Sequence, residues 1–439
     1  MSTKIITVAA VPPTVSTGAD YNKGAPLNAV EFDQNIVNLR AAVDGKEAAN
    51  TNIQSHIAST SNPHATTKTH VGLGNCDNTS DVNKPVSSAT TILIKDRLRA
   101  TIEAASGGRA TVLYTAAGNP TYMNIIPAFN KEDISTNCGT GRHEAFIVNG
   151  VNKSEIFYGT YPGSIIGSEL VSQPMVHPTV SRDFDTFRIA AAACGAGHHL
   201  VSNAERAAVA LWCWKNGFQP RGNNNWGRDV SNQWESARRT DGNLPGVASG
   251  DGATLTGSGP TSWRHDNSAT GISDMNGNVW EWSTGMRINA GEIQVLADNN
   301  AADNTKDVSA ISMLWQAING STGALVAPGS GNTVRYASSG TTAYTLVCGS
   351  GAAFEGMTNP GTTPVSAAAL AKLTSLGMYP VTNSGLGGDV FYLDITGERV
   401  PIFGGGWYSS GGAGVFALYL YGPRSVVDDS IGARPAYVL

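Results

Sequence analysis

The hydrophobic and polar positions of the chain divide it into three regions of different character. Residues 1–24 are rich in Thr, Val and Pro, which favours an extended backbone. Beyond them, large apolar residues recur at i, i+4, i+7 and i+11, namely Phe32, Ile36, Leu39 and Val43. This spacing predicts a helix over 27–43 with a stripe narrow enough for a coiled-coil seam. A helix packed on its own domain is the alternative, but little apolar sequence lies nearby, so we favour the seam.

A polar stretch follows from Asn52 to Thr90, with few large apolar residues. Taken alone it predicts a disordered linker, because one copy cannot bury much apolar area. A short helix over 86–104 is predicted at its end, since Ile94, Leu98 and Ile102 fall along one helical face.

From about Gly107 onward the sequence is rich in Gly and Trp, with short apolar strands and long loops. Eight of the nine Trp lie between Trp212 and Trp315, and Trp407 completes the set. This density predicts one compact α+β domain over 107–439, with an insertion over 299–385 that contains a helix at 366–376.

Local signals predict three elements within this domain. Phe187, Ala191 and Cys194 indicate a helix that Gly195–Gly197 ends. Ser202 and Glu205 have the spacing of a capping box that opens the next helix, which is a structural role. Alternation over Val279–Trp282 predicts a strand with both indoles on one face.

Composition narrows the classes of partner. The net charge is −5 and only 14% of residues are charged, without a basic stripe, so we expect no nucleic-acid partner. No stretch has the length of a signal-peptide core or of a membrane span, so we expect no membrane insertion and release by lysis. The five cysteines form no CxxC pair or zinc-type cluster, and we expect free thiols.

The loop before the Val279–Trp282 strand carries oxygen-bearing side chains at alternate positions, Asp274, Asn276 and Asn278. Such spacing is compatible with a structural calcium ion. Asx residues at this spacing more often satisfy turn amides. We favour the turn interpretation and expect no cofactor.

The segment from Ser61 to Ser87 has the sequence SNPHATTKTHVGLGNCDNTSDVNKPVS. It resembles a segment that recurs in the tail-fibre proteins of tailed phages, over about its whole length. The resemblance implies a homotrimer whose chains intertwine and so supply the core that one copy lacks. It also implies that residues 1–50 attach to phage tail or baseplate proteins, and that residues 51–106 form a trimeric stem.

Three further motifs occur in a fixed order: GISDMNGNVWEW over 271–282, FGGGW over 403–407, and GAR over 432–434. Together they resemble the formylglycine-generating-enzyme branch of the C-type lectin fold. Those enzymes carry paired catalytic cysteines near their final strands, whereas no Cys occurs between Gly404 and Leu439. The oxidase chemistry therefore lacks its nucleophile, and we expect no enzyme.

The C-terminal 40 residues resemble more closely the major tropism determinant family, phage receptor-binding proteins that a retroelement diversifies. The resemblance implies twelve variable, receptor-binding positions: Gly406, Tyr408, Ser409, Ser410, Gly412, Tyr419, Tyr421, Gly422, Val426, Asp428, Ser430 and Ile431. Their Tyr, Ser and Gly content is that of antibody loops. The alternative is that Tyr419 and Tyr421 face a core. Phe403 and Trp407 are expected to be buried supports, and Arg434 an ion-pair or backbone clamp.

The sequence thus predicts a virion protein at the tip of a tail fibre, made in the host cytoplasm. It would bind a host-surface receptor, either a protein or a glycan. The alternatives are an enzyme of the formylglycine-generating type and a polysaccharide-degrading fibre enzyme. A depolymerase requires two carboxylates in one groove. Asp428 and Asp429 are adjacent, while Asp389 and Glu398 are scattered, so the sequence neither supplies nor excludes such a pair.

Overall fold

The computed structural model describes residues 29–48, 51–61, 66–74 and 86–439. The chain divides into two units, Met1–Val86 and Ser87–Leu439. Four of the five cysteines lie in the described residues, and all four are free and buried, as expected for unpaired thiols. Cys76 lies outside the described residues.

The first unit contains two helices, α1 (Ala29–Ala48) and α2 (Thr51–Ala58). The predicted stripe of Phe32, Ile36, Leu39 and Val43 lies on α1, and its members are between 44% and 66% exposed in the single chain. The α2 helix was not predicted, because its segment is polar and too short to show a helical period. In the described part of the fibre-like motif, the Leu73 N–H bonds the Lys68 carbonyl in a tight turn.

The second unit begins with helix α3 (Ser88–Ser106), close to the predicted bounds. Ser87 caps its first turn by accepting from the Thr90 N–H, and Gly107 ends it in the left-handed conformation. Leu98 and Ile102 are half-buried, whereas Ile94 is exposed. The α3 helix therefore belongs to the large domain, although the predicted domain boundary lies after it.

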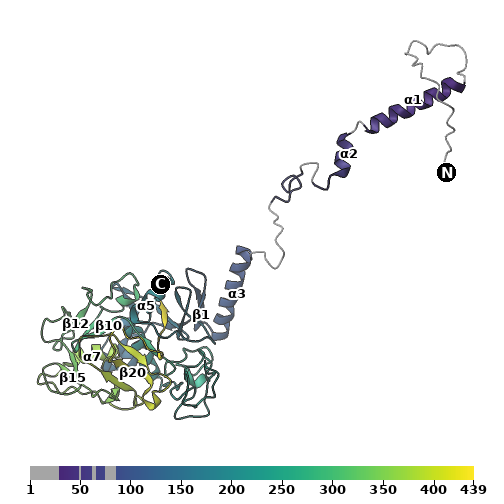
Figure 1. The fold of residues 1–439 in the computed structure, drawn as a ribbon. Helices are drawn as coiled ribbons and strands as arrows, with labels where there is room; N and C mark the ends of the chain where they lie inside the picture. The colour runs from purple at the N-terminus through teal and green to yellow at the C-terminus, as the bar shows by residue number, and fades with distance from the viewer. Residues whose placement is uncertain (1–28, 49–50, 62–65, 75–85) are drawn as a thin grey trace. The chain divides into compact units, whose positions relative to one another are not determined.

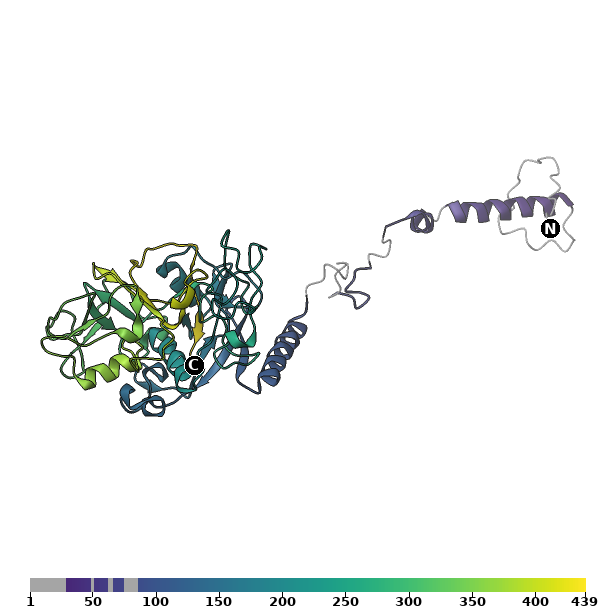
Figure 2. The ribbon, with the colours of Figure 1, turned by 90° about the horizontal axis from the view of Figure 1, so that it is seen from below.

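The large domain is an α+β fold with three main sheets (Figure 1). A five-stranded antiparallel sheet has the order β1 (Ala110–Tyr114), β2 (Pro120–Pro127), β5 (Glu155–Gly159), β22 (Pro435–Tyr437) and β8 (His198–Leu200). The last strand of the chain, β22, thus lies between β5 and β8, which come from the first third of the domain. The C-terminus that follows β22 is marked in Figures 1 and 2. Both ends of the domain are held in one sheet.

The six-stranded sheet carries the predicted motifs. Its order is β16 (Ala352–Ala353), β17 (Val390–Leu393), β20 (Gly414–Leu420), β19 (Ile402–Gly404), β9 (Trp280–Trp282) and β21 (Ile431–Ala433). The three motif segments, far apart in sequence, therefore pair directly: β19 pairs with β9 antiparallel, and β21 pairs with β9 in parallel. Both indoles of β9 belong to one buried cluster, as the alternation predicted.

The third sheet and two hairpins complete the strands. The sheet contains β10 (Met286–Asn289), β11 (Glu292–Val295), β12 (Gln316–Ile318), β13 (Leu325–Val326), β14 (Arg335–Ala337), β15 (Thr345–Val347) and β18 (Glu398–Arg399). The hairpins are β3 (Ile147–Val148) with β4 (Val151–Asn152), and β6 (Gly163–Ile166) with β7 (Glu169–Ser172). The segment predicted as an insertion, 299–385, contributes β12 to this sheet and β16 to the six-stranded sheet, so it is built into the fold.

The remaining helices are α4 (Lys131–Ile134), α5 (Phe184–Ala193), α6 (Asn203–Lys215) and α7 (Ala367–Ser375). The α5 helix ends before Gly195, and α7 begins after its cap Ser366, as predicted. The capping box is present on α6: Ser202 accepts from the Glu205 N–H, and Glu205 accepts from the Ser202 N–H. The Glu205 carboxylate also lies 2.9 Å from His199 Nε2. Ser202, Glu205 and His199 are all buried.

A fragment Ser87–Leu439 should fold with the stability of the full chain, because all three main sheets and the buried core clusters lie within it. Thermal unfolding of the fragment and the full protein, followed by near-ultraviolet circular dichroism, would check this. A midpoint for the fragment many degrees below that of the full chain would show that the first unit supports the domain.

His265 gives the domain a predicted pH dependence. Burial lowers its pKa to about 4, against an ordinary value of 6.5, and Arg109 also disfavours the charged ring. The unfolded chain therefore binds more protons between these values, and stability falls as pH drops through this window, by about 3 kcal/mol at pH 4.

The variant His265→Asn would isolate this contribution, because its amide oxygen can still accept from the Ile272 N–H that bonds the histidine Nδ1. Urea denaturation of the wild type and the variant at pH 7 and pH 4.5 would give the free energy of unfolding that each protein loses between these pH values. The wild type should lose more than the variant. Equal loss of stability in the two proteins would contradict the assignment to His265.

Candidate functional site: an aromatic face on the six-stranded sheet

Strand β20 positions two of the predicted binding residues on one side of the sheet. Strand alternation puts Tyr419 and Tyr421 on the face opposite to Leu418 and Leu420, which are buried in the main core. Tyr392 on the parallel neighbour β17 stands directly beside Tyr419 in register. Tyr392 and Tyr419 on two strands, and Tyr421 just after the end of β20, therefore share one face.

The rings form a connected cluster over a buried indole. Ring centroids lie 6.1 Å apart for Tyr419–Tyr421, 5.6 Å for Tyr392–Tyr419 and 5.5 Å for Trp280–Tyr419. These separations and tilted arrangements are those of favourable aromatic pairs. We call Tyr392, Tyr408, Tyr419 and Tyr421 the tyrosine face. Tyr408 and Tyr421 are its outermost members, 51% and 52% exposed.

Tyr408 is held by hydrogen bonds from the loop before β21. Its hydroxyl lies 3.0 Å from Ser430 Oγ, and the Ser430 N–H and hydroxyl both donate to the Asp428 carboxylate. Burial, followed by the nearby carboxylates Asp428 and Asp429, raises the pKa of Tyr408, so its phenol stays neutral and able to donate. The ring also packs edge-on against Trp407, with centroids 5.7 Å apart. Its exposed side is therefore presented in a fixed orientation.

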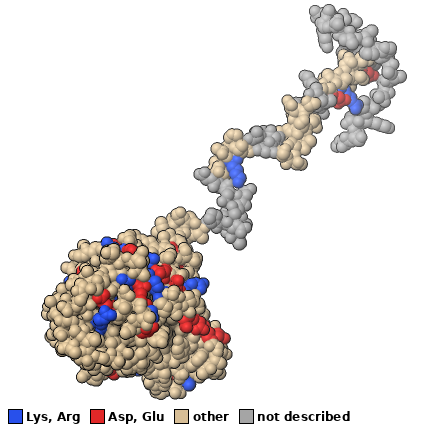
Figure 3. Space-filling view, turned by 60° about the vertical axis from the view of Figure 1, so that its left-hand side comes forward, with Lys and Arg blue, Asp and Glu red and all other residues tan. Residues whose placement is uncertain are grey.

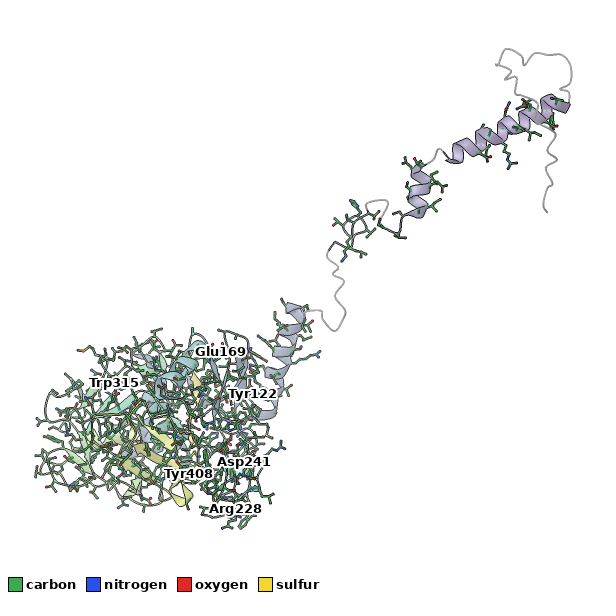
Figure 4. All side chains as sticks on the ribbon, viewed as in Figure 1. Tyr122, Glu169, Arg228, Asp241, Trp315 and Tyr408 are labelled. Atoms are coloured by element: carbon green, nitrogen blue, oxygen red, sulfur yellow. The ribbon has the colours of Figure 1, made fainter. Side chains whose placement is uncertain are left out.

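Carboxylates lie at the edge of this face. Asp428 and Asp429 are both exposed, and burial of part of Asp429, with the charges of Asp428 and Asp251, raises its pKa. Figure 4 shows Tyr408 in the lower part of the domain as drawn, below the level of α3. The arrangement offers hydroxyl donors, aromatic surface and negative charge to a partner that approaches this end of the domain.

The twelve predicted positions differ in their access to solvent. Tyr408, Ser410, Tyr421 and Asp428 are exposed, and Ser409, Gly412, Tyr419 and Val426 are half-buried. The remaining four, Gly406, Gly422, Ser430 and Ile431, are buried, which corrects their expected place on the contact surface.

Each buried position has a structural reason. Ile431 pairs with Trp280 within the sheet, and Ser430 carries the hydrogen bonds that hold Asp428. A Cβ on Gly406 would lie 3.3 Å from the Trp280 ring, and one on Gly422 would lie 3.0 Å from Val426. These four residues support the surface from below, and none of them exposes a side chain on it.

Tyr392 was not among the predicted binding residues, because it lies outside the C-terminal stretch that carries the resemblance. It belongs to the short apolar run Val390–Leu393, and only the parallel pairing of β17 with β20 shows which strand this run joins. The partner of a strand is a long-range property that a single sequence does not display.

The expected supports of this face are confirmed. Phe403 and Trp407 are both buried. The Trp407 N–H donates to the Asn278 carbonyl at 3.0 Å, and its own carbonyl accepts from the Trp226 N–H at 2.8 Å. The loop that carries Tyr408 is therefore tied to two other loops through one residue.

Arg434 is the predicted ion pair and also a backbone clamp. It is fully buried, and its guanidinium binds both oxygens of Glu281. It also donates to the carbonyls of Gly159 and Ser273, at 2.9 Å each. One side chain thus joins the motif strand β9 to the five-stranded sheet.

The loop that carries Asp274, Asn276 and Asn278 is bonded to separate loops of the protein. Asp274 accepts from the Gly257 N–H at 2.7 Å, Asn278 accepts from the Thr254 N–H at 2.8 Å, and Asn276 donates to the Pro220 carbonyl. These bonds favour the turn interpretation of the motif. Within the described ranges, no group of three His, Cys, Asp or Glu side chains is arranged to hold a metal ion.

Several of the thiols and carboxylates outside the tyrosine face are protonated or paired. Burial raises the pKa of Cys138, Cys194 and Cys213 to about 12, so these thiols stay protonated. Glu398 is ion-paired to Arg287 at 2.9 Å and to Arg424 at 3.0 Å. Asp389 is buried and accepts from the Phe416 N–H.

Acidic and basic side chains are interspersed on the face of the domain in Figure 3, without a continuous basic surface there. None of the helices in the described parts of the chain is long and apolar enough to cross a membrane. In comparisons with known proteins, no family model matches this sequence and no curated protein is significantly similar to it.

Proposed function

We propose that this chain is a phage tail-fibre receptor-binding protein that attaches the virion to a host cell through the tyrosine face. The observation that carries the proposal is the ring cluster of Tyr392, Tyr419 and Tyr421, with neighbouring centroids 5.6 and 6.1 Å apart. The half-exposed ring of Tyr408, which packs on Trp407, extends this face. Exposed aromatic clusters of this kind are typical of binding surfaces.

Tyrosine side chains lose little conformational entropy when they bind a partner. Each ring covers a large contact area with only two side-chain torsions to fix. Here part of that cost is already met, because Tyr408 is anchored by Ser430 and Tyr419 is packed against Trp280. The rings lie on a paired sheet, so exposed residues can vary while the support stays rigid.

The large domain is proposed to be C-type-lectin-like. The joining of both ends of the domain in one sheet, and the direct pairing of the three motif strands, support this assignment. The receptor is a protein or a glycan, and the binding mode requires no cofactor, nucleic acid or membrane insertion.

The first unit is proposed to be the stem of a homotrimer on the virion, attached to phage tail or baseplate proteins through its N-terminus. The apolar stripe on α1 supports this, because Phe32, Ile36, Leu39 and Val43 are exposed in one chain and would be buried in a coiled coil. Three receptor sites on one fibre would convert weak single contacts into avid attachment.

The proposal is tested by adsorption of a fluorescent fusion of the full chain to a panel of bacterial strains. We expect saturable binding to a restricted set of strains, with none after heat unfolding. Release of reducing sugar from capsule, or conversion of a cysteine in a sulfatase peptide to formylglycine, would instead support the enzymatic alternatives. Binding to no strain, or equal binding to all, would contradict the proposal.

A further inference from the structure

A cleft of about 530 Å³ lies on the large domain, formed by β2, α4, α6 and the loop at 265–266. Its lining residues include none of the tyrosine face. The volume lies within the range of small-molecule sites, which is about 300–1,000 Å³.

The floor and walls of the cleft are mainly apolar. Ile126, Ile134 and Val209 line it and are buried, and the aromatic rings of Phe129 and Trp212 line it while remaining half-buried. An apolar hollow of this size exposes hydrophobic surface to water, which a ligand with an apolar body would cover.

One buried polar group in the cleft has an unused donor. His265 is 6% exposed, lines the cleft, and packs beside Trp212 with ring centroids 5.2 Å apart. Its Nδ1 accepts from the Ile272 N–H at 2.9 Å, which places the proton of the neutral ring on Nε2. Among the described residues, no acceptor bonds this Nε2–H.

Two more donors in the lining lack acceptors. Neither the Trp212 indole N–H nor the Lys215 ammonium group has a hydrogen-bond or ion-pair partner in the described parts of the chain, and Lys215 is exposed at the rim. The acids nearby are already engaged: Asp266 accepts from Ser268 and faces Arg109 at 3.6 Å, and Asp133 accepts from the Asn130 N–H. Within the described residues, the unpaired groups of His265, Trp212 and Lys215 are donors, one of them cationic, and the amide oxygen of Asn216 is an unpaired acceptor in the same lining.

We propose that this cleft binds a small carboxylic acid with an apolar body, such as a medium-chain fatty acid. The aliphatic and aromatic lining would cover the apolar body. The carboxylate would accept from the His265 Nε2–H and pair with Lys215. The inference does not depend on the proposed function of the tyrosine face.

The test is calorimetric titration of the full chain with decanoate, and with decan-1-ol as the neutral counterpart. Decanoate should bind saturably in the millimolar range or tighter, and decan-1-ol about tenfold more weakly, because it lacks the charge for Lys215. Absence of saturable binding, or equal binding of the two probes, would overturn the proposal.

Two variants locate the carboxylate. His265→Asn keeps an acceptor for the Ile272 N–H but removes the Nε2–H, because its shorter amide does not reach that position, and should weaken decanoate binding about tenfold. Lys215→Ala should weaken it severalfold, and its exposed position leaves folding intact even if the first variant unfolds. Lys306→Ala, in a surface pair with Asp303, is the matched control and should bind normally. Binding unchanged in Lys215→Ala would reject the site.

Discussion

Replacing Arg434 by Met should lower the free energy of unfolding of the large domain by about 3–5 kcal/mol, the cost of breaking a buried ion pair. Arg434 is fully buried and holds both oxygens of Glu281. Its loss would leave Glu281 with only Arg206, 3.6 Å away, and would leave the Gly159 and Ser273 carbonyls without this donor. The Met side chain fills similar space, so the decrease in the free energy of unfolding would come from the lost ion pair and hydrogen bonds and not from a cavity.

Urea denaturation of the fragment Ser87–Leu439 would measure this change. Arg188→Met is the matched control, because Arg188 is half-exposed and pairs only with Asp185 within the same helix, at 3.4 Å. That change should stay within about 0.5 kcal/mol. A loss below about 1 kcal/mol in Arg434→Met would show that the clamp is not a main support of the fold.

The double variant Ile36→Asp, Leu39→Asp should dissociate the proposed trimer and weaken cell adsorption about a hundredfold. Both residues belong to the exposed apolar stripe of α1, and two buried carboxylates per chain would oppose a coiled-coil seam. Loss of the trimer would remove avidity while the tyrosine face stays intact, and avidity accounts for factors of about 10²–10⁴.

Sedimentation equilibrium and adsorption would be measured together on this variant. The control is Asn38→Asp, Ala41→Asp, which adds the same charge to α1 at exposed positions between the stripe residues. We expect this control to remain trimeric and to adsorb normally. A wild-type protein that is monomeric, or a stripe variant that stays trimeric, would contradict the proposed stem.

Local signals in the sequence were sufficient for much of the secondary structure. The Ser202–Glu205 spacing predicted the buried capping box, and the glycines after Cys194 predicted the end of α5. The buried roles of Trp407 and Arg434 followed from the family resemblance. The first two features depend only on residues that are close together in the sequence. The last two were implied by the motifs that resemble a known family.

Features that depend on long-range pairing could not be predicted in the same way. The proximity of Tyr392 to Tyr419 arises from the parallel pairing of β17 and β20. The burial of Ile431 and Gly406 arises from their contact with Trp280, over a hundred residues earlier in the chain. The cleft near His265 likewise combines β2, α4 and α6, and no single segment contains its pattern.

A second surface is the principal rival to the tyrosine face. Ile311 and Met313 are 88% and 94% exposed on a loop of the 299–385 segment. Arg287 and Arg424 hold this loop by donating to the carbonyls of Ala310 and Val308. A rigid, exposed apolar tip of this kind is also suited to contact with a partner.

The central claim is tested most directly by adsorption of the triple variant Tyr408→Ala, Tyr419→Ala, Tyr421→Ala to a strain that the wild-type protein binds. Trp234→Ala, which removes an exposed aromatic residue outside the face, is the matched control. We expect that the folded, trimeric triple variant loses adsorption, while Trp234→Ala adsorbs as wild type. Equal adsorption of the triple variant and the wild type would contradict it and would direct the search to the loop that carries Ile311 and Met313.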